Sequence, residues 1–412
     1  MQQFLFTKSY VPILFKLLFI SAPLVSVSCG KQFSNKSRQN NLPFTTLQTI
    51  ENTILNLANT DSRLQMNPIY FKEGMLIAVP SDNEKIHISG DFNYWQSDAM
   101  AEFNGWSWYF IPQQDMPSLD QGRYKLEINN QYHADKRSQF YEYDQHGEIS
   151  WFRHPKDRSM LARHYIEGTH KVKGRWINIL IPSGLENWPV LLMQDGQNLF
   201  SPDAAHGSWK VKQTADQHYK KSLIIGIDNS SERMREYTHT SDLNLSDDLG
   251  DEYLDFVVNK VLKQSCELYT CDLERVGIAG SSLGGLISLY AGIKYPDQFS
   301  FIASLSGTLG WGRLKQNNKT VVEYYAKIEN FEAKIYLDSG GSPGQDGRCL
   351  DQDNDGFPED DSDDSDNFCM NAYFKNSLSH KLDLTYYWET NAGHNEAAWA
   401  RRFPNVIAEF LK

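Results

Sequence analysis

The chain has 412 residues, of which 40% are hydrophobic and 13% aromatic, and its formal net charge is −12. This length and apolar content suit two or three compact domains with sizeable cores, and they exclude a globally disordered chain. The acidic balance excludes a general nucleic-acid-binding protein, which needs a basic face. Nine acidic side chains lie between Asp351 and Asp366, with no Lys or Arg among them, so most of the net charge belongs to one short segment.

The first 28 residues have the order of an export signal. Lys8 and Lys16 provide positive charge, an apolar run extends from Leu17 to Val27, and small residues precede Cys29. A cysteine at this place resembles the lipobox of bacterial lipoproteins, although Ser26 stands where that pattern usually has Leu. We therefore expect an exported protein of the bacterial cell envelope, held at the membrane by a lipid on Cys29, with ordinary secretion as the alternative.

The other four cysteines fall into two local pairs, Cys266 with Cys271 and Cys349 with Cys369. Local pairs are typical of disulfides in an oxidising compartment, and closing the longer loop would stabilise the fold by about 3 kcal/mol. Spacing does not distinguish disulfides from four free thiols, but the lack of a C-x2-C spacing argues against zinc.

Residues 29–65 are expected to form a polar tether followed by a short helix, because apolar residues recur at helical spacing from Leu47 to Leu57. Between 66 and 165, short strand-like runs such as 75–79, 85–89 and 123–128 alternate with turn residues, which predicts a small antiparallel β-sandwich. Three tryptophans of this region fit either the sandwich core or a surface for stacking sugar rings: Trp95, Trp106 and Trp108.

From about 170 to 412 the pattern changes to apolar strands that alternate with helices. Helical patterns cover 250–264, 283–294 and 396–411. Such alternation predicts the α/β class, with a mostly parallel sheet covered by helices on both faces. The expected strands are 176–180, 190–193, 223–227, 275–279, 301–305, 334–337 and 384–389.

The motif Gly280-Ser281-Ser282-Leu283-Gly284 lies between an expected strand and an expected helix. That context is the nucleophile elbow of α/β hydrolases, in which small residues let the chain turn sharply and lift the serine hydroxyl above the sheet. A structural glycine turn is the alternative. We therefore predict that Ser282 is a catalytic nucleophile.

A serine nucleophile needs a base, which follows the last strand in α/β hydrolases, and an acid that orients the base. His394 follows the strand 384–389 and is the predicted base. The acid is expected after the strand 334–337, where Asp366 is our first choice, Asp338 the second and Asp346 the third. Backbone N–H groups of Leu283 and Gln197 are the expected oxyanion donors.

Several segments together resemble the putative esterase family of α/β hydrolases, which includes enterochelin esterases, S-formylglutathione hydrolases, feruloyl esterases and mycolyltransferases. The resemblance implies an α/β-hydrolase fold and supports the roles of Ser282 and His394. Asp366-Asn367-Phe368 is similar to the Asp-Gln-Phe stretch that carries the acid in S-formylglutathione hydrolases. The segments are Asp195 to Phe200, Gly226 to Asn229, Arg233 to Thr238, Ala279 to Gly285, and Gly393 to Glu396 with Trp399.

The preceding β region also resembles a known domain type, through Gly90-Asp91-Phe92-Asn93-Tyr94-Trp95, Gly105 to Trp108 and Gly122 to Tyr124. These residues are similar to early-set, glycogen-binding-type domains, which precede the hydrolase domain in enterochelin-type esterases. The chain differs from the family in the acidic insertion 346–369, which is bracketed by cysteines.

The acidic insertion begins like an EF-hand loop. Asp351, Asp353 and Asp355 occupy positions 1, 3 and 5, Gly356 position 6 and Glu359 position 9, while position 12 is a serine. We expect a structural Ca²⁺ site, with further ligands from Asp361 and Asp363, and a solvated charged loop is the alternative.

These observations predict an exported serine esterase that hydrolyses a carboxylic ester through an acyl-enzyme, without a cofactor for catalysis. The substrate is expected to be a small siderophore-type ester or a carbohydrate or feruloyl ester. Two alternatives stay open: an acyltransferase that uses the same residues, and a non-catalytic, calcium-dependent glycan-binding lipoprotein.

Overall fold

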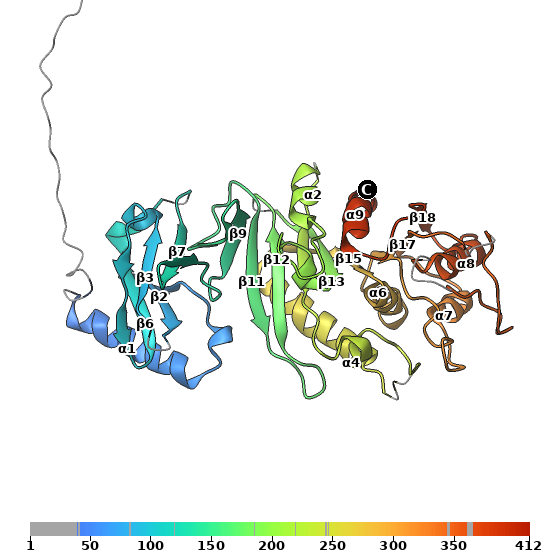
Figure 1. Ribbon diagram of the computed structural model, residues 1–412, viewed down its shortest axis with the longest axis horizontal. Helices are drawn as coiled ribbons and strands as arrows, with labels where there is room; N and C mark the ends of the chain where they lie inside the picture. Colours follow the sequence, from blue (N-terminus) through green and yellow to red (C-terminus); the bar gives the residue numbers. More distant parts are fainter. Residues whose placement is uncertain are drawn as a thin grey trace, which may run out of the picture.

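The computed structural model describes residues 39, 42–81, 84–118, 120–184, 186–218, 220–243, 245, 247–343, 347–360 and 366–412. The predicted signal, Cys29, Asp346, Asp361 and Asp363 lie outside the described residues. The molecule is elongated, with a β-rich region at the N-terminal end and a sheet covered by helices at the C-terminal end (Figure 1). Within the described ranges, no helix combines the length and the apolar character that crossing a bilayer requires.

The N-terminal region contains two antiparallel sheets, and the sheet in the order β1-β2-β6-β5 is covered on both faces. On β2, Met75 and Ile77 face the second sheet, whereas Leu76 and Ala78 face helix α1, because side chains alternate along a strand. The elements are α1 (Phe44–Asn59), η2 (Ser62–Leu64), β1 (Ile69–Phe71), β2 (Gly74–Pro80), β5 (Ala101–Phe103), β6 (Trp106–Pro112) and η4 (Gln113–Asp115).

The second sheet of this region has the strand order β9-β10-β7-β3-β4, with β8 paired to β7. Trp106 and Trp108 are buried in the core beside α1, whereas Trp95 is 37% exposed. The core interpretation therefore holds for Trp106 and Trp108. The elements are β3 (Ile86–Gly90), η3 (Asp91–Asn93), β4 (Asp98–Ala99), β7 (Arg123–Ile128), β8 (Gln131–His133), β9 (Phe140–Asp144) and β10 (Gly147–Trp151).

Strand β11 (Met160–Ile166) connects the two halves of the molecule. It pairs with β9 through Leu161 and Ala162, and along its whole length with β12. The sheet then continues in the order β12-β14-β13-β15-β16-β17-β18. Strand β12 is antiparallel to both of its neighbours. The six strands that follow it in this order, β14, β13, β15, β16, β17 and β18, are mutually parallel. The strands are β12 (Arg175–Ile181), β13 (Trp188–Gln194), β14 (Leu223–Ile227), β15 (Cys271–Ser281), β16 (Phe301–Leu305), β17 (Lys334–Ser339) and β18 (Leu384–Trp388).

Helices cover both faces of this sheet, as the apolar strands require. Helices α2 and α9 pack on one face, and α4, α6, α7 and α8 pack on the other (Figure 1). The predicted α/β-hydrolase fold with a preceding β-sandwich is thus confirmed. The helices are η5 (Gly196–Asn198), α2 (Val211–Gln217), α3 (Arg233–Glu236), α4 (Gly250–Phe256), η6 (Val257–Leu262), α5 (Lys263–Leu268), α6 (Leu283–Lys294), α7 (Val321–Lys327), α8 (Phe368–Leu378) and α9 (Glu396–Phe410).

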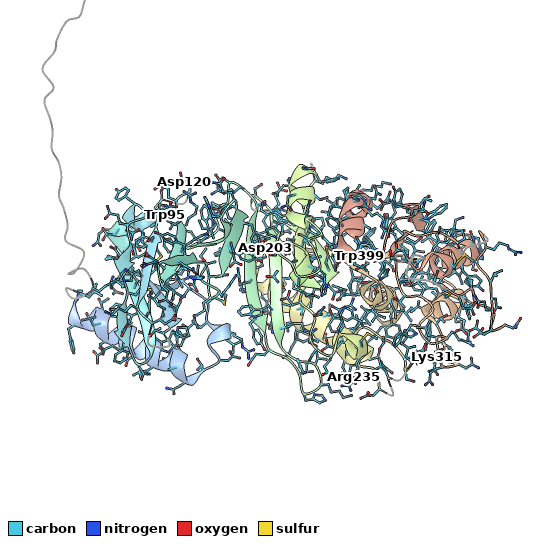
Figure 2. All side chains as sticks on the ribbon, in the orientation of Figure 1. Trp95, Asp120, Asp203, Arg235, Lys315 and Trp399 are labelled. Atoms are coloured by element: carbon cyan, nitrogen blue, oxygen red, sulfur yellow. A yellow bond between two sulfur atoms is a disulfide. The ribbon has the colours of Figure 1, made fainter. Side chains whose placement is uncertain are left out.

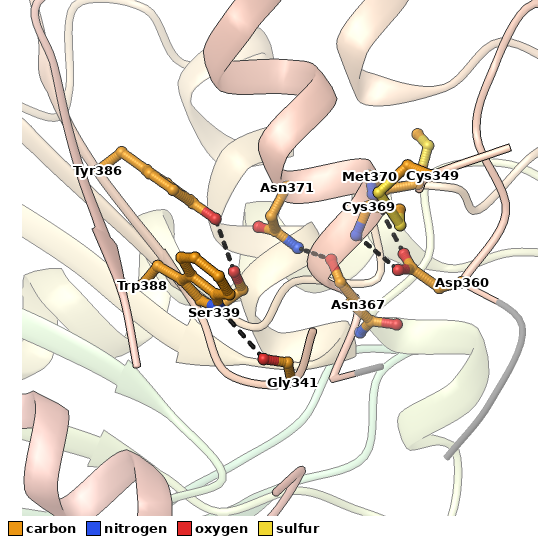
Figure 3. The surroundings of a disulfide bond; sticks show 10 residues. All are labelled: Ser339, Gly341, Cys349, Asp360, Asn367, Cys369, Met370, Asn371, Tyr386 and Trp388. Carbon is orange, nitrogen blue, oxygen red and sulfur yellow. Dashed lines mark hydrogen bonds between the residues drawn. A yellow bond between two sulfur atoms is a disulfide. The ribbon is translucent and has the colours of Figure 1, made fainter. Parts of the chain in front are cut away.

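Both expected cysteine pairs form disulfides in the structure. Cys266–Cys271 joins α5 to the first residue of β15. Cys349–Cys369 joins the loop after β17 to the first turn of α8 (Figure 3). The second disulfide therefore anchors the acidic segment beside the residues that follow Asp366.

Candidate active site

Ser282 occupies a sharp turn between β15 and α6. Its backbone angles are φ 56° and ψ −125°, a conformation that costs a non-glycine residue free energy and persists only when the surroundings hold it. The neighbouring glycines permit the turn, because a Cβ at Gly280 would lie 2.5 Å from the carbonyl carbon of Gly284. The hydroxyl of Ser282 lies 3.4 Å from Thr308 Oγ1. This local geometry matches the expected elbow.

His394 and Asp366 are in direct contact. His394 Nδ1 lies 2.6 Å from Asp366 Oδ1, and the carboxylate is fully buried while the imidazole is about one-third exposed. An ionised carboxylate accepts hydrogen bonds only, so Nδ1 carries the proton and Nε2 is the atom left with a lone pair. The ring also stands edge-on to Trp399, with centroids 5.0 Å apart.

The second oxygen of Asp366 is held by protein donors. The Gly340 N–H donates to Oδ2 at 2.5 Å and the Ser306 hydroxyl at 2.7 Å. Asp366 and Asn367 both adopt left-handed backbone angles, which turn the chain sharply into α8. These contacts fix the carboxylate toward the imidazole.

Asp338, the second choice for the acid, faces a different set of groups. It is fully buried at the end of β17, where Tyr336 donates to its Oδ2 at 3.1 Å and Arg402 Nε lies 3.3 Å from Oδ1. Burial raises the pKa of this carboxyl to about 7. Of the predicted acids within the described residues, Asp366 is the one that contacts His394.

The loop after β13 brings Gln197 to the same site. Asp195 is left-handed with φ 55°, and Gly196 passes so close to β14 that a Cβ there would lie 2.5 Å from the Gly226 carbonyl carbon. The Asn229 N–H donates to the side-chain oxygen of Gln197 at 3.0 Å. Leu283 is the first residue of α6, whose first N–H groups have no partner within the helix.

Ser282, His394 and Gln197 line one cavity of about 660 Å³, large enough for a small ester. Most of its lining residues are polar, and Trp209 and Trp399 are its largest apolar side chains. Trp399 lies beside this site, far from Trp95 of the N-terminal region (Figure 2). The other lining residues include Asn198, His206, Asn229, Arg233 and Glu396.

Sequence reasoning assigned no role to several polar residues of this cavity. The Arg233 guanidinium donates twice to the Asp195 carboxylate at 2.8 Å, and Asn198 donates to Glu396 at 3.1 Å. Burial raises the pKa of the Glu396 carboxyl. Arg233 and Glu396 both lie in segments that carry the family resemblance, which was the available signal.

The acidic insertion gathers four carboxylates that could hold a cation. Asp351, Asp353, Asp355 and Glu359 each offer an oxygen, and these oxygens all lie within 4.8 Å of one another. The neighbouring Asp360 instead accepts hydrogen bonds from the N–H groups of Cys369 and Met370 at the start of α8 (Figure 3). The acidic segment and the acid-bearing turn are thus joined at α8.

Comparisons with known proteins agree with this architecture. Residues 173–410 match the family described as Putative esterase. The uncharacterized protein YbbA of Bacillus subtilis (strain 168) is 26% identical over 193 residues, which cover 44% of this chain and 74% of YbbA.

Solved structures that align with this chain include the enterobactin esterase FES from Shigella flexneri in the presence of enterobactin. That comparison covers 85% of this chain and 96% of FES, at 13% identity and a TM-score of 0.46. The IroE-like serine hydrolase from Shewanella oneidensis covers 61% of this chain and 80% of its own, at 19% identity and a TM-score of 0.47. Because the family match spans more than half of its length, the chain belongs to the putative esterase family and is a carboxylic ester hydrolase.

Proposed function

We propose that the protein is a serine esterase in which Ser282 is the nucleophile, His394 the general base and Asp366 the orienting acid. The observation that carries this proposal is the 2.6 Å contact between His394 Nδ1 and Asp366 Oδ1 at the cavity that Ser282 also lines. A base oriented by a buried carboxylate next to an elbow serine is the arrangement that activates a hydroxyl for attack.

In the first half of the reaction, Ser282 Oγ attacks the ester carbonyl carbon while His394 Nε2 takes the hydroxyl proton. The resulting oxyanion accepts hydrogen bonds from the N–H groups of Leu283 and Gln197. His394 then returns the proton to the leaving alcohol, and the C–O bond of the ester breaks to leave an acyl group on Ser282. Water, activated by the same imidazole, releases the acid and restores the serine.

Replacing Ser282 tests this proposal. Hydrolysis of p-nitrophenyl acetate should fall to background in Ser282→Ala. Ser300→Ala is the matched control, because Ser300 bonds Val276 O just before β16, away from the elbow. Turnover by the Ser282 variant equal to that of the control would refute the assignment. A panel of siderophore, feruloyl and acetyl-sugar esters then separates the two substrate classes.

We also propose that the protein is exported and held at a membrane by a lipid on Cys29. The signal-like order of residues 1–28 supports this proposal, as do two disulfides, which persist in oxidising compartments. In the proposed organisation, a β-sandwich at 66–165 precedes a hydrolase domain at 170–412. Cys29→Ser should move the protein from the membrane fraction to the soluble fraction, and an unchanged distribution would argue against the anchor.

We further propose that the carboxylates of Asp351, Asp353, Asp355 and Glu359 hold a structural Ca²⁺. Calcium prefers hard oxygen ligands, and four carboxylates within 4.8 Å of one another fit that preference. Such a cation would relieve the repulsion among these acids, while the hydrolysis itself proceeds through serine.

Thermal unfolding with and without Ca²⁺ tests the calcium proposal. With a Kd of about 10⁻³ M, 10 mM Ca²⁺ would stabilise the fold by about 1.4 kcal/mol. Asp353→Asn together with Asp355→Asn should abolish the increase in Tm. Identical melting temperatures of the wild-type protein in Ca²⁺ and in chelator would contradict the site.

A further inference from the structure

A buried arginine lies directly behind the contact between Asp366 and His394. Arg402, on α9, is 1% exposed. Its Nη2 donates to Ser306 Oγ at 2.7 Å, its Nη1 lies 3.3 Å from Asp366 Oδ2, and its Nε lies 3.3 Å from Asp338 Oδ1. A buried charge is stable only when it is paired and hydrogen-bonded, so this guanidinium and its partners form one unit.

The two oxygens of Asp366 have different partners within this unit. Oδ2 receives the Gly340 N–H, the Ser306 hydroxyl and the Arg402 guanidinium, whereas Oδ1 faces His394 Nδ1. A Cβ at residue 340 would lie 2.3 Å from Oδ2, so glycine is required for this approach. With Oδ2 held from three sides, the carboxylate is prevented from rotating away from the imidazole.

Ser306 is the centre of this arrangement and uses its full hydrogen-bonding capacity. Its hydroxyl donates to Asp366 and accepts from Arg402 Nη2 and from Trp399 Nε1, the latter at 3.2 Å. Trp399 also packs against His394, and it lies on α9 together with Arg402. The same helix therefore supports both the imidazole and the carboxylate.

The unit contains two acidic side chains and one basic side chain. Asp338 and Asp366 are both buried and flank one guanidinium, so the unit carries one net negative charge when both carboxylates are ionised. That charge favours the imidazolium that forms on the base during catalysis. Without the guanidinium, these two carboxyl groups would face each other in a desolvated site with no positive partner.

We propose that Arg402 is a positioning residue of the esterase, which holds Oδ2 of Asp366 so that Oδ1 stays on His394. The inference rests on the proposed roles of Ser282, His394 and Asp366. Arg402 acts through Asp366 and does not line the substrate cavity as the structure defines it.

The test compares Arg402→Met with Arg402→Lys over about pH 5 to 9, using p-nitrophenyl acetate and a Tm measurement for each variant. Arg402→Met should lower kcat by about 10- to 100-fold with little change in KM, because the acid is misplaced. It should also move the acid limb of the kcat profile to higher pH, since loss of a nearby positive charge stabilises the imidazolium. Arg402→Lys keeps the charge and should restore the position of the limb and part of kcat.

None of these substitutions removes another titratable group near His394, but burial raises the pKa of Asp338 to about 7, within the measured interval. The shift is therefore read against Arg402→Lys, which keeps a positive charge beside Asp338. Arg163→Met is the matched control, because it removes a partly buried arginine of β11 that pairs with Glu148, in another part of the sheet. It should lower Tm without moving the limb. The other titratable groups near His394 are Asp366 before α8, Glu396 on α9, Asp195 after β13, His206 before α2 and Asp338 on β17.

A folded Arg402→Met protein with wild-type kcat and an unshifted limb would overturn the proposal, and so would a loss of kcat without a shift. If that variant does not fold, kcat is measured on Arg402→Met combined with Asp338→Asn, which removes opposite charges together. This protein should lose kcat by a similar factor without a shift of the limb, and a wild-type kcat in it would overturn the proposal. A fully active Ser282→Ala protein would instead refute the proposed function itself, so the two failures are distinguishable.

Discussion

Removing the disulfide between Cys349 and Cys369 should affect both stability and activity. This disulfide closes the loop that contains the acidic cluster, and Cys369 follows Asp366 by three residues (Figure 3). The perturbation is Cys349→Ser with Cys369→Ser. Its matched control is Cys266→Ser with Cys271→Ser, at the other disulfide.

The two loops differ in length, and this difference sets the expected loss of stability. A cross-link stabilises chiefly by reducing the conformational entropy of the unfolded chain, and the effect grows with the logarithm of loop length. A separation of 20 residues corresponds to about 3.3 kcal/mol, and one of 5 residues to about 2.1 kcal/mol. The Cys349 and Cys369 variant should therefore lose about 1 kcal/mol more than the control.

The effect on catalysis should separate the two variants more clearly. Cys369 lies in the first turn of α8, where Asp360 also accepts its N–H, and Asp366 enters this turn with a left-handed backbone. Loosening the turn should misplace Asp366 and lower kcat by about 10-fold or more, because small displacements of catalytic groups are costly. The control disulfide joins α5 to the first residue of β15 and should leave kcat unchanged.

Urea unfolding gives the two free energies, and p-nitrophenyl acetate hydrolysis gives kcat. Both are measured at one pH and one Ca²⁺ concentration, since a bound cation would add to the stability of the folded state. Equal values of kcat in the two variants would refute the reasoning that this disulfide supports the acid. A smaller stability loss at the longer loop than at the shorter one would refute the entropic argument.

Three further predictions concern the site and its surroundings. Asp366→Asn should lower kcat by about 10⁴-fold because the imidazole loses its orientation, and a kcat close to wild type would remove Asp366 from the mechanism. Gly280→Ala should abolish activity and lower Tm, since its Cβ would lie 2.5 Å from the Gly284 carbonyl, and an active, stable variant would contradict the elbow geometry. Burial raises the pKa of Asp228 to about 7, so the folded state binds a proton that the unfolded state releases, and stability falls as pH rises from about 4 to about 7. Asp228→Asn keeps an oxygen for Asn178 Nδ2 and should gain stability relative to wild type over that interval, by about 4 kcal/mol at most, as measured by urea unfolding at its two ends.

Features that depend on neighbouring residues were predictable from the sequence. The strand, the glycine-flanked Ser282 and the following helix are contiguous, so one segment of chain contains everything that the elbow requires. Strands that alternate apolar and polar residues bury one face, and strands with continuous apolar runs bury both faces. The first pattern predicted the β-sandwich and the second the α/β sheet. The two cysteine pairs are also local in sequence, and both form.

The choice among acids depended on contacts that no local pattern contains. Asp338 and Asp366 both follow the apolar part of β17, but the structure turns Asp338 toward Arg402 and Tyr336 and turns Asp366 toward His394. The same holds for Arg402, which lies 36 residues after Asp366 and reaches it only because α9 packs back across the sheet.

The sequence by itself therefore determined the fold class, the elbow serine and the cysteine pairs, because each depends on residues that are close along the chain. Tertiary structure alone decided which carboxylate contacts the imidazole, that the Arg402 guanidinium contacts this carboxylate, and how β11 joins the sandwich to the hydrolase sheet. Those choices depend on buried charges and backbone donors brought together from distant segments, where the cost of an unpaired group selects one arrangement.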